Sequence, residues 1–243
     1  MTSTVPTRPQ PPIILVPGYW LGAWAWDEVC DHLTAAGIRN VAMTLPGLDA
    51  QDPERTTRTL HDQADAIRSA MTEAGGDVVL VAHSGANAPV SLALDRAPQL
   101  IRRVVWVDSG PVASGAVGAP GLPHAVVELP LPEFEVLAQQ ASLDGLSREQ
   151  LDRFRARAIA QPASAAREQL ELNDDARYAL PTTVICCSMP STQVRELARS
   201  GHPMFAELAR LPQLDLVDVP TGHWPMWSRP RELAEAIAAA ATR

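Results

Sequence analysis

Short apolar runs alternate with amphipathic segments along the first 110 residues. The apolar runs lie at residues 12–16, 41–45, 78–82 and 101–107. The segments between them place apolar side chains at helical spacing and cover residues 24–36, 59–74 and 86–96. Strands that alternate with helices of this length are typical of βαβ units, so the pattern predicts a parallel sheet with helices on both faces.

The alternation stops after residue 110 and resumes near residue 181. Residues 111–180 show no convincing buried strand, only a Gly/Pro-rich loop and helical segments near 133–143, 147–160 and 163–172. A strand at 182–187, a helical stretch at 194–209, a strand at 214–219 and a helix from about residue 230 follow. Because long interruptions of a compact domain are usually functional, we interpret residues 111–180 as a lid inserted between two core strands.

One α/β domain accounts for the whole pattern. The 243 residues, 46% of them hydrophobic, are enough for a single large core. The predicted fold is a mostly parallel, doubly wound sheet, with a flexible leader at 1–11, a core at 12–110 and 181–243, and a helical lid at 111–180. Within the lid, Arg153, Arg155 and Arg157 are expected to form a solvated helix face.

Composition and charge exclude several classes of function. The formal charge of −8 and the absence of a basic cluster argue against nucleic acid or an anionic membrane as a partner. All twenty basic residues are arginine, which excludes Schiff-base chemistry, pyridoxal phosphate attachment and a Walker lysine. The expected partner is a small-molecule substrate, and the sequence does not indicate the oligomeric state.

The three cysteines, Cys30, Cys186 and Cys187, form neither a disulfide framework nor a metal-ligand spacing. We therefore expect no metal and no cofactor, and a reducing compartment. Because residues 1–11 lack the apolar core of a signal peptide and no apolar stretch is long enough to span a bilayer, a cytoplasmic location is predicted.

The segment DVVLVAHSGAN carries the strongest chemical signal of the chain. Ser84 follows a buried strand and precedes a helix, and the flanking positions are Ala82 and Ala86. A nucleophile elbow requires small residues at these two positions because the strand-to-helix turn is tight. Gly85 would leave its backbone N–H free to face a group bound by the serine. The alternative is that Ser84 is only a helix N-cap.

His223 and Asp108 are the predicted partners of Ser84. His223 lies in the loop after the last strand, at the carboxyl edge of the sheet where open α/β folds bind ligands. Asp108 ends the strand that follows the elbow unit and therefore lies on the same edge. The chain order Ser, Asp, His is that of a catalytic triad. The alternatives are a solvent-exposed loop histidine and an aspartate that merely caps a turn.

Other positions for the acid remain open. The strand after Asp108 ends in Cys-Cys-Ser-Met-Pro, without a carboxylate at the more frequent acid position. Asp218 is the second choice, although it and Asp215 read as solvent-facing residues of an edge strand. If neither Asp108 nor Asp218 acts, a Ser84–His223 dyad or a lid carboxylate such as Glu128 would have to do so.

The opening IILVPGYWLGAWAWDEV is similar to that of the α/β-hydrolase superfamily, in the small cofactor-free branch of plant-type methyl esterases and hydroxynitrile lyases. That branch has His-Gly-x-x-His-Gly-Ala-Trp, and here Pro17 and Leu21 replace the histidines while the Gly-Ala-Trp residues match. The resemblance implies the α/β-hydrolase fold. It also implies an oxyanion hole from the N–H groups of Tyr19 and Gly85, and a pocket position for Trp20.

The expected function is hydrolysis of a small or medium apolar carboxylic ester, lactone or thioester through an acyl-serine. Apolar lid residues predict an apolar pocket; its expected lining is Trp20, Phe134, Leu137 and Trp224. Two alternatives remain open, namely a non-hydrolytic lyase or cyclase that uses the same Ser84 and His223, and a ligand-binding receptor. A hydroxynitrile lyase is disfavoured because that chemistry relies on a pocket lysine in the similar branch. Epoxide hydrolases and haloalkane dehalogenases are disfavoured because their elbow carries aspartate.

Overall fold

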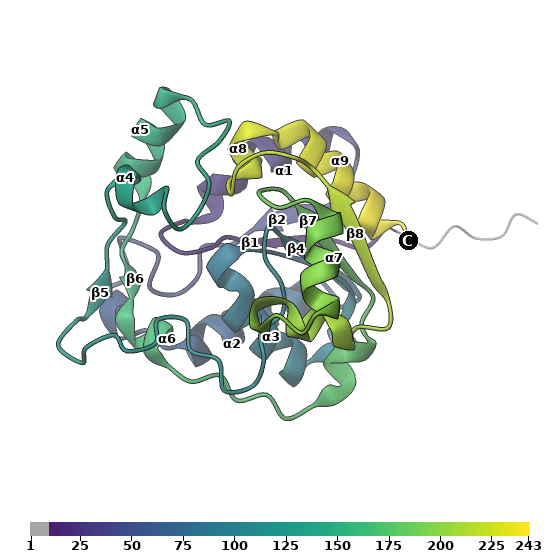
Figure 1. The fold of residues 1–243 in the computed structure, drawn as a ribbon, viewed down its shortest axis with the longest axis horizontal. Coiled ribbons are helices and arrows are strands. Elements are labelled where there is room, and N and C mark those ends of the chain that lie inside the picture. Colours follow the sequence, from purple (N-terminus) through teal and green to yellow (C-terminus); the bar gives the residue numbers. More distant parts are fainter. Residues whose placement is uncertain (1–9) are drawn as a thin grey trace, which may run out of the picture.

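A six-stranded parallel sheet forms the centre of the molecule (Figure 1). The computed structural model describes residues 10–243, so the leader predicted for residues 1–11 lies outside the described residues except for its last two positions. The strand order is β2-β1-β3-β4-β7-β8, and every neighbouring pair is parallel. The bounds are β1 Ile13–Val16, β2 Asn40–Ala42, β3 Val78–His83, β4 Ile101–Val107, β7 Thr182–Cys186 and β8 Leu214–Asp218. The predicted fold class is confirmed.

Alternate strand residues enter two separate cores, as the two-residue period of a strand requires. Ile13 and Leu15 of β1 pack into one apolar cluster, whereas Ile14 and Val16 pack into the other. The first cluster also contains Leu33 from α1 and Ile237 from α9; the second contains residues of α2, α3 and α7. The sheet is therefore covered on both faces, which explains why its strands read as continuous apolar runs.

The main helices lie near their predicted positions. Their bounds are α1 Asp27–Ala35, α2 Leu60–Glu73, α3 Asn87–Arg96, α7 Ser191–Arg199 and α9 Pro230–Ala241. Thr59 caps α2 by accepting the Asp62 N–H, while the Asp62 carboxylate accepts the Thr59 N–H, so this start signal is a capping box. Among residues 10–243, no helix combines the length and apolarity needed to cross a bilayer.

The inserted segment, residues 111–180, contains more strand and less helix than its sequence pattern predicts. Its elements are β5 Glu128–Leu129, α4 Phe134–Leu137, α5 Arg148–Arg157, β6 Gln161–Pro162, α6 Ala163–Arg167 and the 3₁₀ helix η5 Asp175–Ala179. β5 and β6 pair antiparallel, in a two-stranded sheet that we did not predict. Two-residue strands are too short to give a period, and Pro162 in β6 reads as a breaker.

The insertion packs into the body of the protein rather than standing apart. Phe154 of α5 is fully buried and Leu137 of α4 is 2% exposed, and both belong to the same cluster as β1 and α9. The expected solvated arginine face is only partly correct, because the three side chains are 35–50% exposed but also contact aromatic rings. Three guanidinium groups of α5 lie 4.5–5.6 Å from aromatic ring centres, in the pairs Arg153 with Trp227, Arg155 with Phe134 and Arg157 with Trp24. Cation–π contacts thus fix this helix to the core.

The order of the strands places a topological switch point between β1 and β3. The chain passes from β1 to β2 on one side and then to β3 on the other, and Val16 ends β1 beside Ala82 of β3. The loops that follow β1 and β3 therefore diverge from a shared edge, which is where open α/β sheets bind ligands.

Candidate active site

Ser84 occupies a strained turn directly after β3. Its backbone has φ +51°, a left-handed conformation that non-glycine residues rarely adopt. Ala82 and Ala86, on either side, are buried, at most 1% exposed. The helix that follows, α3, has Ala86 at its N-cap and no side-chain capping bond. The interpretation of Ser84 as an N-cap is therefore wrong.

The loop after β1 lies directly against this turn. A Cβ atom at Gly18 would come within 2.9 Å of the Ser84 Cβ, so only glycine permits the approach. The Tyr19 ring covers Gly85, where a Cβ would lie 2.6 Å from a ring carbon. Tyr19 and Gly85, the predicted oxyanion-hole residues, are thus in contact. Burial raises the pKa of the Tyr19 phenol. In the described part of the chain, neither residue's N–H donates a backbone hydrogen bond to another loop.

His223 links Ser84 to Asp108. Its Nε2 lies 2.7 Å from Ser84 Oγ and its Nδ1 lies 2.6 Å from Asp108 Oδ2. Since a carboxylate can only accept, Nδ1 carries the hydrogen and Nε2 is left to accept from the serine hydroxyl. The side chains of His223 and Asp108 are 16% and 7% exposed, and Ser84 is partly exposed. The three predicted residues form one continuous hydrogen-bonded chain.

Asp108 is held as an ionised group by four hydrogen bonds. Oδ1 accepts from the N–H groups of Cys187 and Ser188, and Oδ2 accepts from the Ser188 hydroxyl and His223 Nδ1. Burial alone would raise the pKa of this carboxyl, but the bonds from His223 and Ser188 outweigh it and lower the pKa to about 2. Asp108 also has positive φ, at +44°. Sequence reasoning missed Ser188, which stands where the acid was expected and not found.

The two alternative carboxylates are engaged elsewhere. Asp218 accepts the N–H and the hydroxyl of Ser191 at 2.7 and 2.6 Å, at the start of α7. Glu128, in β5, forms an ion pair with Arg55. Neither carboxylate has a contact with His223 among the interactions of residues 10–243.

His83 is a site residue that the sequence did not bring to attention. It is 1% exposed, and its Nε2 lies 2.7 Å from the backbone oxygen of His223. Burial, together with the nearby His223, lowers the pKa of His83 to about 3, so the ring is neutral. The available signal was its position immediately before Ser84, at the last residue of a buried strand.

The predicted pocket residues differ in accessibility. Trp20 is partly buried, and its indole N–H donates to the Leu129 carbonyl at 2.9 Å. Phe134 is also partly buried, under the Arg155 guanidinium. Leu137 and Trp224 are each 2% exposed and pack within the core, with the Trp224 ring edge-on to that of His223. Their role as pocket lining stays a prediction.

Other chemistry has weaker support in the described residues. No group of three His, Cys, Asp or Glu side chains within residues 10–243 is arranged to hold a metal ion. Burial raises the pKa of the Cys186 thiol to about 12 and also raises that of Cys187, so neither is a ready thiolate. A hollow of about 300 Å³ lies beside α7 and β8, but it is lined by neither Ser84 nor His223.

The comparisons with known proteins agree with this architecture. The chain is 34% identical to methyl jasmonate esterase 1 of Vitis vinifera over 99 residues, which are 40% of this chain and 38% of that protein. It is 28% identical to a carbendazim hydrolyzing esterase of Nocardioides sp. over 93% of this chain and 98% of that protein. The match to methyl jasmonate esterase 1 thus spans less than two fifths of that protein's length.

Solved structures share the fold. An extracellular alpha/beta-hydrolase from a Paenibacillus species superimposes with a TM-score of 0.74 at 19% identity, covering 95% of this chain and 98% of that one. The model of the alpha/beta hydrolase family matches residues 13–236, which include the whole sheet and every residue of the hydrogen-bonded chain from Ser84 to Asp108. This protein belongs to the alpha/beta hydrolase family.

Proposed function

We propose that the protein hydrolyses a small or medium apolar carboxylic ester, lactone or thioester through an acyl-serine intermediate. The observation that carries the proposal is the unbroken chain from Ser84 Oγ to His223 Nε2 at 2.7 Å and from His223 Nδ1 to Asp108 Oδ2 at 2.6 Å. The esterase names of its relatives are consistent with this chemistry.

Each residue of the chain has a step that its contacts favour. His223 takes the Ser84 proton as general base, and Ser84 Oγ attacks the substrate carbonyl carbon. Asp108, ionised because its pKa is about 2, holds the tautomer that leaves Nε2 free and stabilises the imidazolium. His223 then returns the proton to the leaving group, and water attacks the acyl-serine by the same route.

The oxyanion of the tetrahedral intermediate would be bound by the N–H groups of Tyr19 and Gly85. These residues follow adjacent strands at the switch point, and the Tyr19 ring lies against Gly85. Loss of one such donor typically costs about 3 kcal/mol of transition-state stabilisation. Pro17, which replaces the first histidine of the similar branch, has no backbone N–H, but the proposed donors at Tyr19 and Gly85 keep theirs.

The inserted segment is proposed to act as the lid that shapes the acyl or alcohol pocket. Trp20 touches it directly, through the hydrogen bond to Leu129, and Phe134 lies on its α4 helix. Because the proposed lining residues are apolar or aromatic, an apolar substrate group would fit them best.

The test combines a fluorophosphonate probe with p-nitrophenyl esters of increasing acyl length. Labelling of Ser84 together with turnover supports the hydrolase. Labelling without turnover of any ester would favour a non-hydrolytic enzyme on the same residues, and absence of both would favour a ligand-binding protein. The Ser84→Ala variant is the control for labelling at any other nucleophile.

A further inference from the structure

The backbone of His223 is held on both sides. Its N–H donates to the Ser142 carbonyl at 2.7 Å, and its own carbonyl faces His83 Nε2 at 2.7 Å. The preceding residue, Gly222, donates its N–H to the Asp144 carbonyl at 3.1 Å. A Cβ at Gly222 would lie within 2.7 Å of backbone atoms of Asp144 and Ser142, so the loop passes with no space to spare.

His83 is a polar residue at a buried position, the last residue of β3. The ring packs edge-on against Trp26, with ring centres 6.3 Å apart, and lies 4.9 Å from the ring of His223. Its Nδ1 is buried and has no hydrogen-bond partner among residues 10–243. A buried polar atom without a partner costs stability. An apolar side chain would avoid this cost, so the reason for a histidine must lie in its other nitrogen.

That other nitrogen is a donor to the loop of the proposed base. A carbonyl oxygen only accepts, so Nε2 carries the hydrogen and Nδ1 does not. The bond joins the last residue of β3 to the loop after β8, two segments that are 140 residues apart in sequence. It therefore ties the residue next to Ser84 to the backbone of His223.

We propose that His83 is a positioning residue, whose Nε2–H fixes the His223 carbonyl and thereby the orientation of the His223 imidazole between Ser84 and Asp108. The inference rests on the proposed function, because His223 needs this alignment only if it is the base. Misplacement of a catalytic group by about 1 Å can cost about a hundredfold in rate, so one backbone anchor is enough to matter.

The neutrality of His83 suits this task. His223 gains a proton in the proposed reaction, and a second cation 4.9 Å away would oppose it. The charged and titratable groups that bear on His83 are His223 and Asp108, and burial keeps His83 itself uncharged. The ring thus supplies a donor without supplying a charge.

The experiment compares two variants of the full chain. His83→Leu removes the donor and keeps an apolar filler, whereas His83→Gln can present an amide N–H to the same carbonyl. With p-nitrophenyl esters we expect His83→Leu to lower kcat by about 10- to 100-fold with KM within twofold of wild type. His83→Gln should recover most of that loss. The rate of fluorophosphonate labelling of Ser84 should follow kcat.

Three results would overturn the inference. One is a His83→Leu enzyme with kcat and labelling rate within twofold of wild type. Another is an equal loss in His83→Leu and His83→Gln, which would mean that ring packing matters and the donor does not. Failure of the wild-type chain to label or turn over would overturn the proposed function and this inference with it. If His83→Leu does not fold by circular dichroism, His83→Met replaces it in the same comparison with His83→Gln.

Discussion

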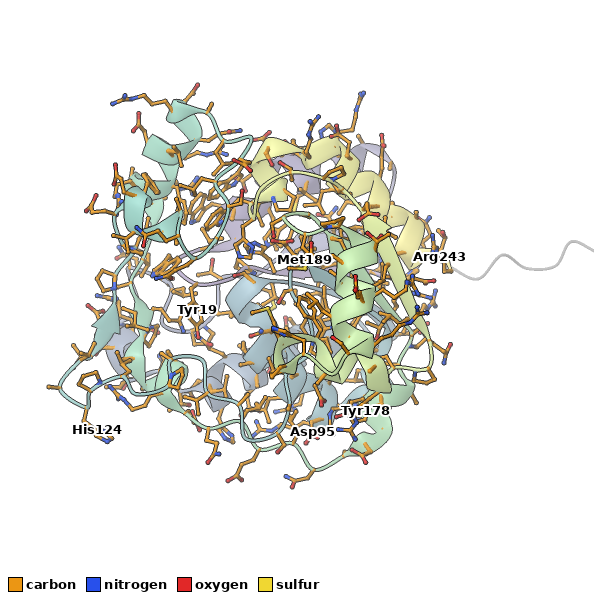
Figure 2. The ribbon with its side chains drawn as sticks, viewed as in Figure 1. Tyr19, Asp95, His124, Tyr178, Met189 and Arg243 are labelled. Carbon is orange, nitrogen blue, oxygen red and sulfur yellow. The ribbon has the colours of Figure 1, made fainter. Side chains whose placement is uncertain are left out.

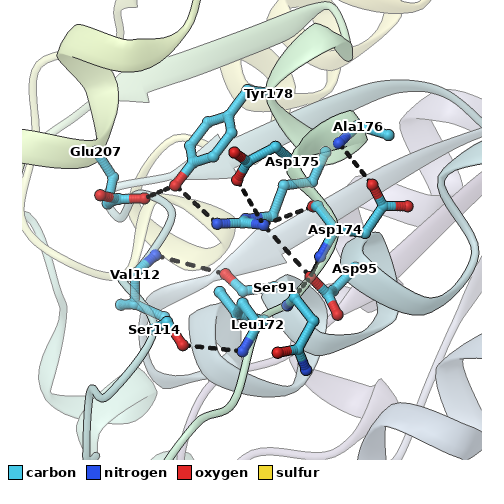
Figure 3. A network of polar contacts seen from close by, with 12 residues as sticks. Ser91, Asp95, Val112, Ser114, Leu172, Asp174, Asp175, Ala176, Tyr178 and Glu207 are labelled. Atoms are coloured by element: carbon cyan, nitrogen blue, oxygen red, sulfur yellow. Dashed lines mark hydrogen bonds and ion pairs between the residues drawn. The ribbon is translucent and has the colours of Figure 1, made fainter.

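Two polar networks join distant parts of this chain, and they are built differently. The first runs from Ser84 through His223 to Asp108 at the carboxyl edge of the sheet. The second is centred on Arg177 and Tyr178 of η5 (Figure 3). Tyr19, whose ring lies against Gly85, marks the first network in Figure 2, and Tyr178 marks the second, in another part of the molecule.

The second network is closed. The buried Arg177 guanidinium donates to Asp95 at 3.3 Å and to the Tyr178 hydroxyl at 2.8 Å. The Tyr178 hydroxyl donates to Glu207 and accepts from Arg210. Each charged group meets a partner, and together they attach the end of the insertion to α3 and to η6, the 3₁₀ helix Pro203–Arg210. Satisfied networks of this kind rigidify a fold.

The first network ends at a solvent-accessible side chain, Ser84, and two of its residues have strained backbone conformations. Ser84 is partly exposed, and both it and Asp108 have positive φ, whereas Arg177, Tyr178 and Glu207 do not. Backbone strain persists only where the surrounding structure enforces it, and it clusters at functional sites. Charge and burial therefore do not separate the network for which catalysis is proposed from the network that joins structural elements. What separates them is the partly exposed Ser84 hydroxyl in a strained turn.

Removing the Ser84 hydroxyl, the accessible end of the first network, should have the largest effect on activity. We expect Ser84→Ala to lower kcat by about a millionfold, because the nucleophile is lost. Stability should be unchanged or slightly higher, since alanine leaves no hydroxyl to satisfy. Ester turnover and urea unfolding measure the two quantities. Activity of Ser84→Ala near the wild-type level would contradict the catalytic role proposed for the first network.

Changing the other end of the same network should have the next largest effect. Asp108→Asn keeps the shape but favours the wrong tautomer of His223, so kcat should fall by up to about ten-thousandfold with little change in KM. Asp218→Asn is the matched control, because Asp218 contacts Ser191 rather than His223, and it should cost little. A reversed pair of results would move the acid to the last strand. If both were silent, the site would work as a Ser84–His223 dyad or with another carboxylate.

Acid should weaken the fold mainly at His83, which borders the first network through the His223 carbonyl. Burial lowers the pKa of His83 to about 3 from 6.5, so between these values the unfolded chain binds a proton that the folded chain excludes. The contribution of His83 to stability is therefore fully present above pH 6.5 and is lost as pH drops through this window, by on the order of 5 kcal/mol. Asp108, with its pKa lowered to about 2, loses its contribution only below about pH 4.

Urea unfolding at pH 7, 5 and 4 measures this dependence. His83→Gln cannot titrate, so its unfolding free energy should vary less with pH than that of the wild type. Equal slopes for the two proteins would show that His83 is not the group excluded from protonation.

The closed network should respond in stability alone and by the smallest amount. Tyr178→Phe removes the hydroxyl that joins Arg177, Glu207 and Arg210, and should cost about 1–3 kcal/mol of unfolding free energy because their hydrogen bonds lose a partner. Ester turnover at 25 °C should stay within twofold of wild type. A large fall in kcat without a fall in stability would mean that the two networks are coupled.

The sequence was most informative where one period covers a whole element. The strand at 101–107 was predicted with the bounds it has in the structure, and α2 differs by one residue at each end. It was least informative at β2, which is three residues long and has Val41 half-exposed, and in the insertion, where two-residue strands carry no period. The arginines of α5 show the same limit, because their aromatic partners come from three separate segments.

The sequence by itself predicted Ser84, Asp108 and His223 as one group, because small residues around a serine and polar residues at strand ends are local signals, and the three side chains do meet in the structure. Only the tertiary structure decided what supports them. Ser188 donates to Asp108, the Ser142 carbonyl accepts the His223 N–H, and His83 donates to the His223 carbonyl. These three supporting residues come from three different segments. Contacts of this kind depend on which loops, far apart in sequence, meet at one edge of the sheet and on how residues 111–180 fold back, and no local pattern in the sequence records these meetings.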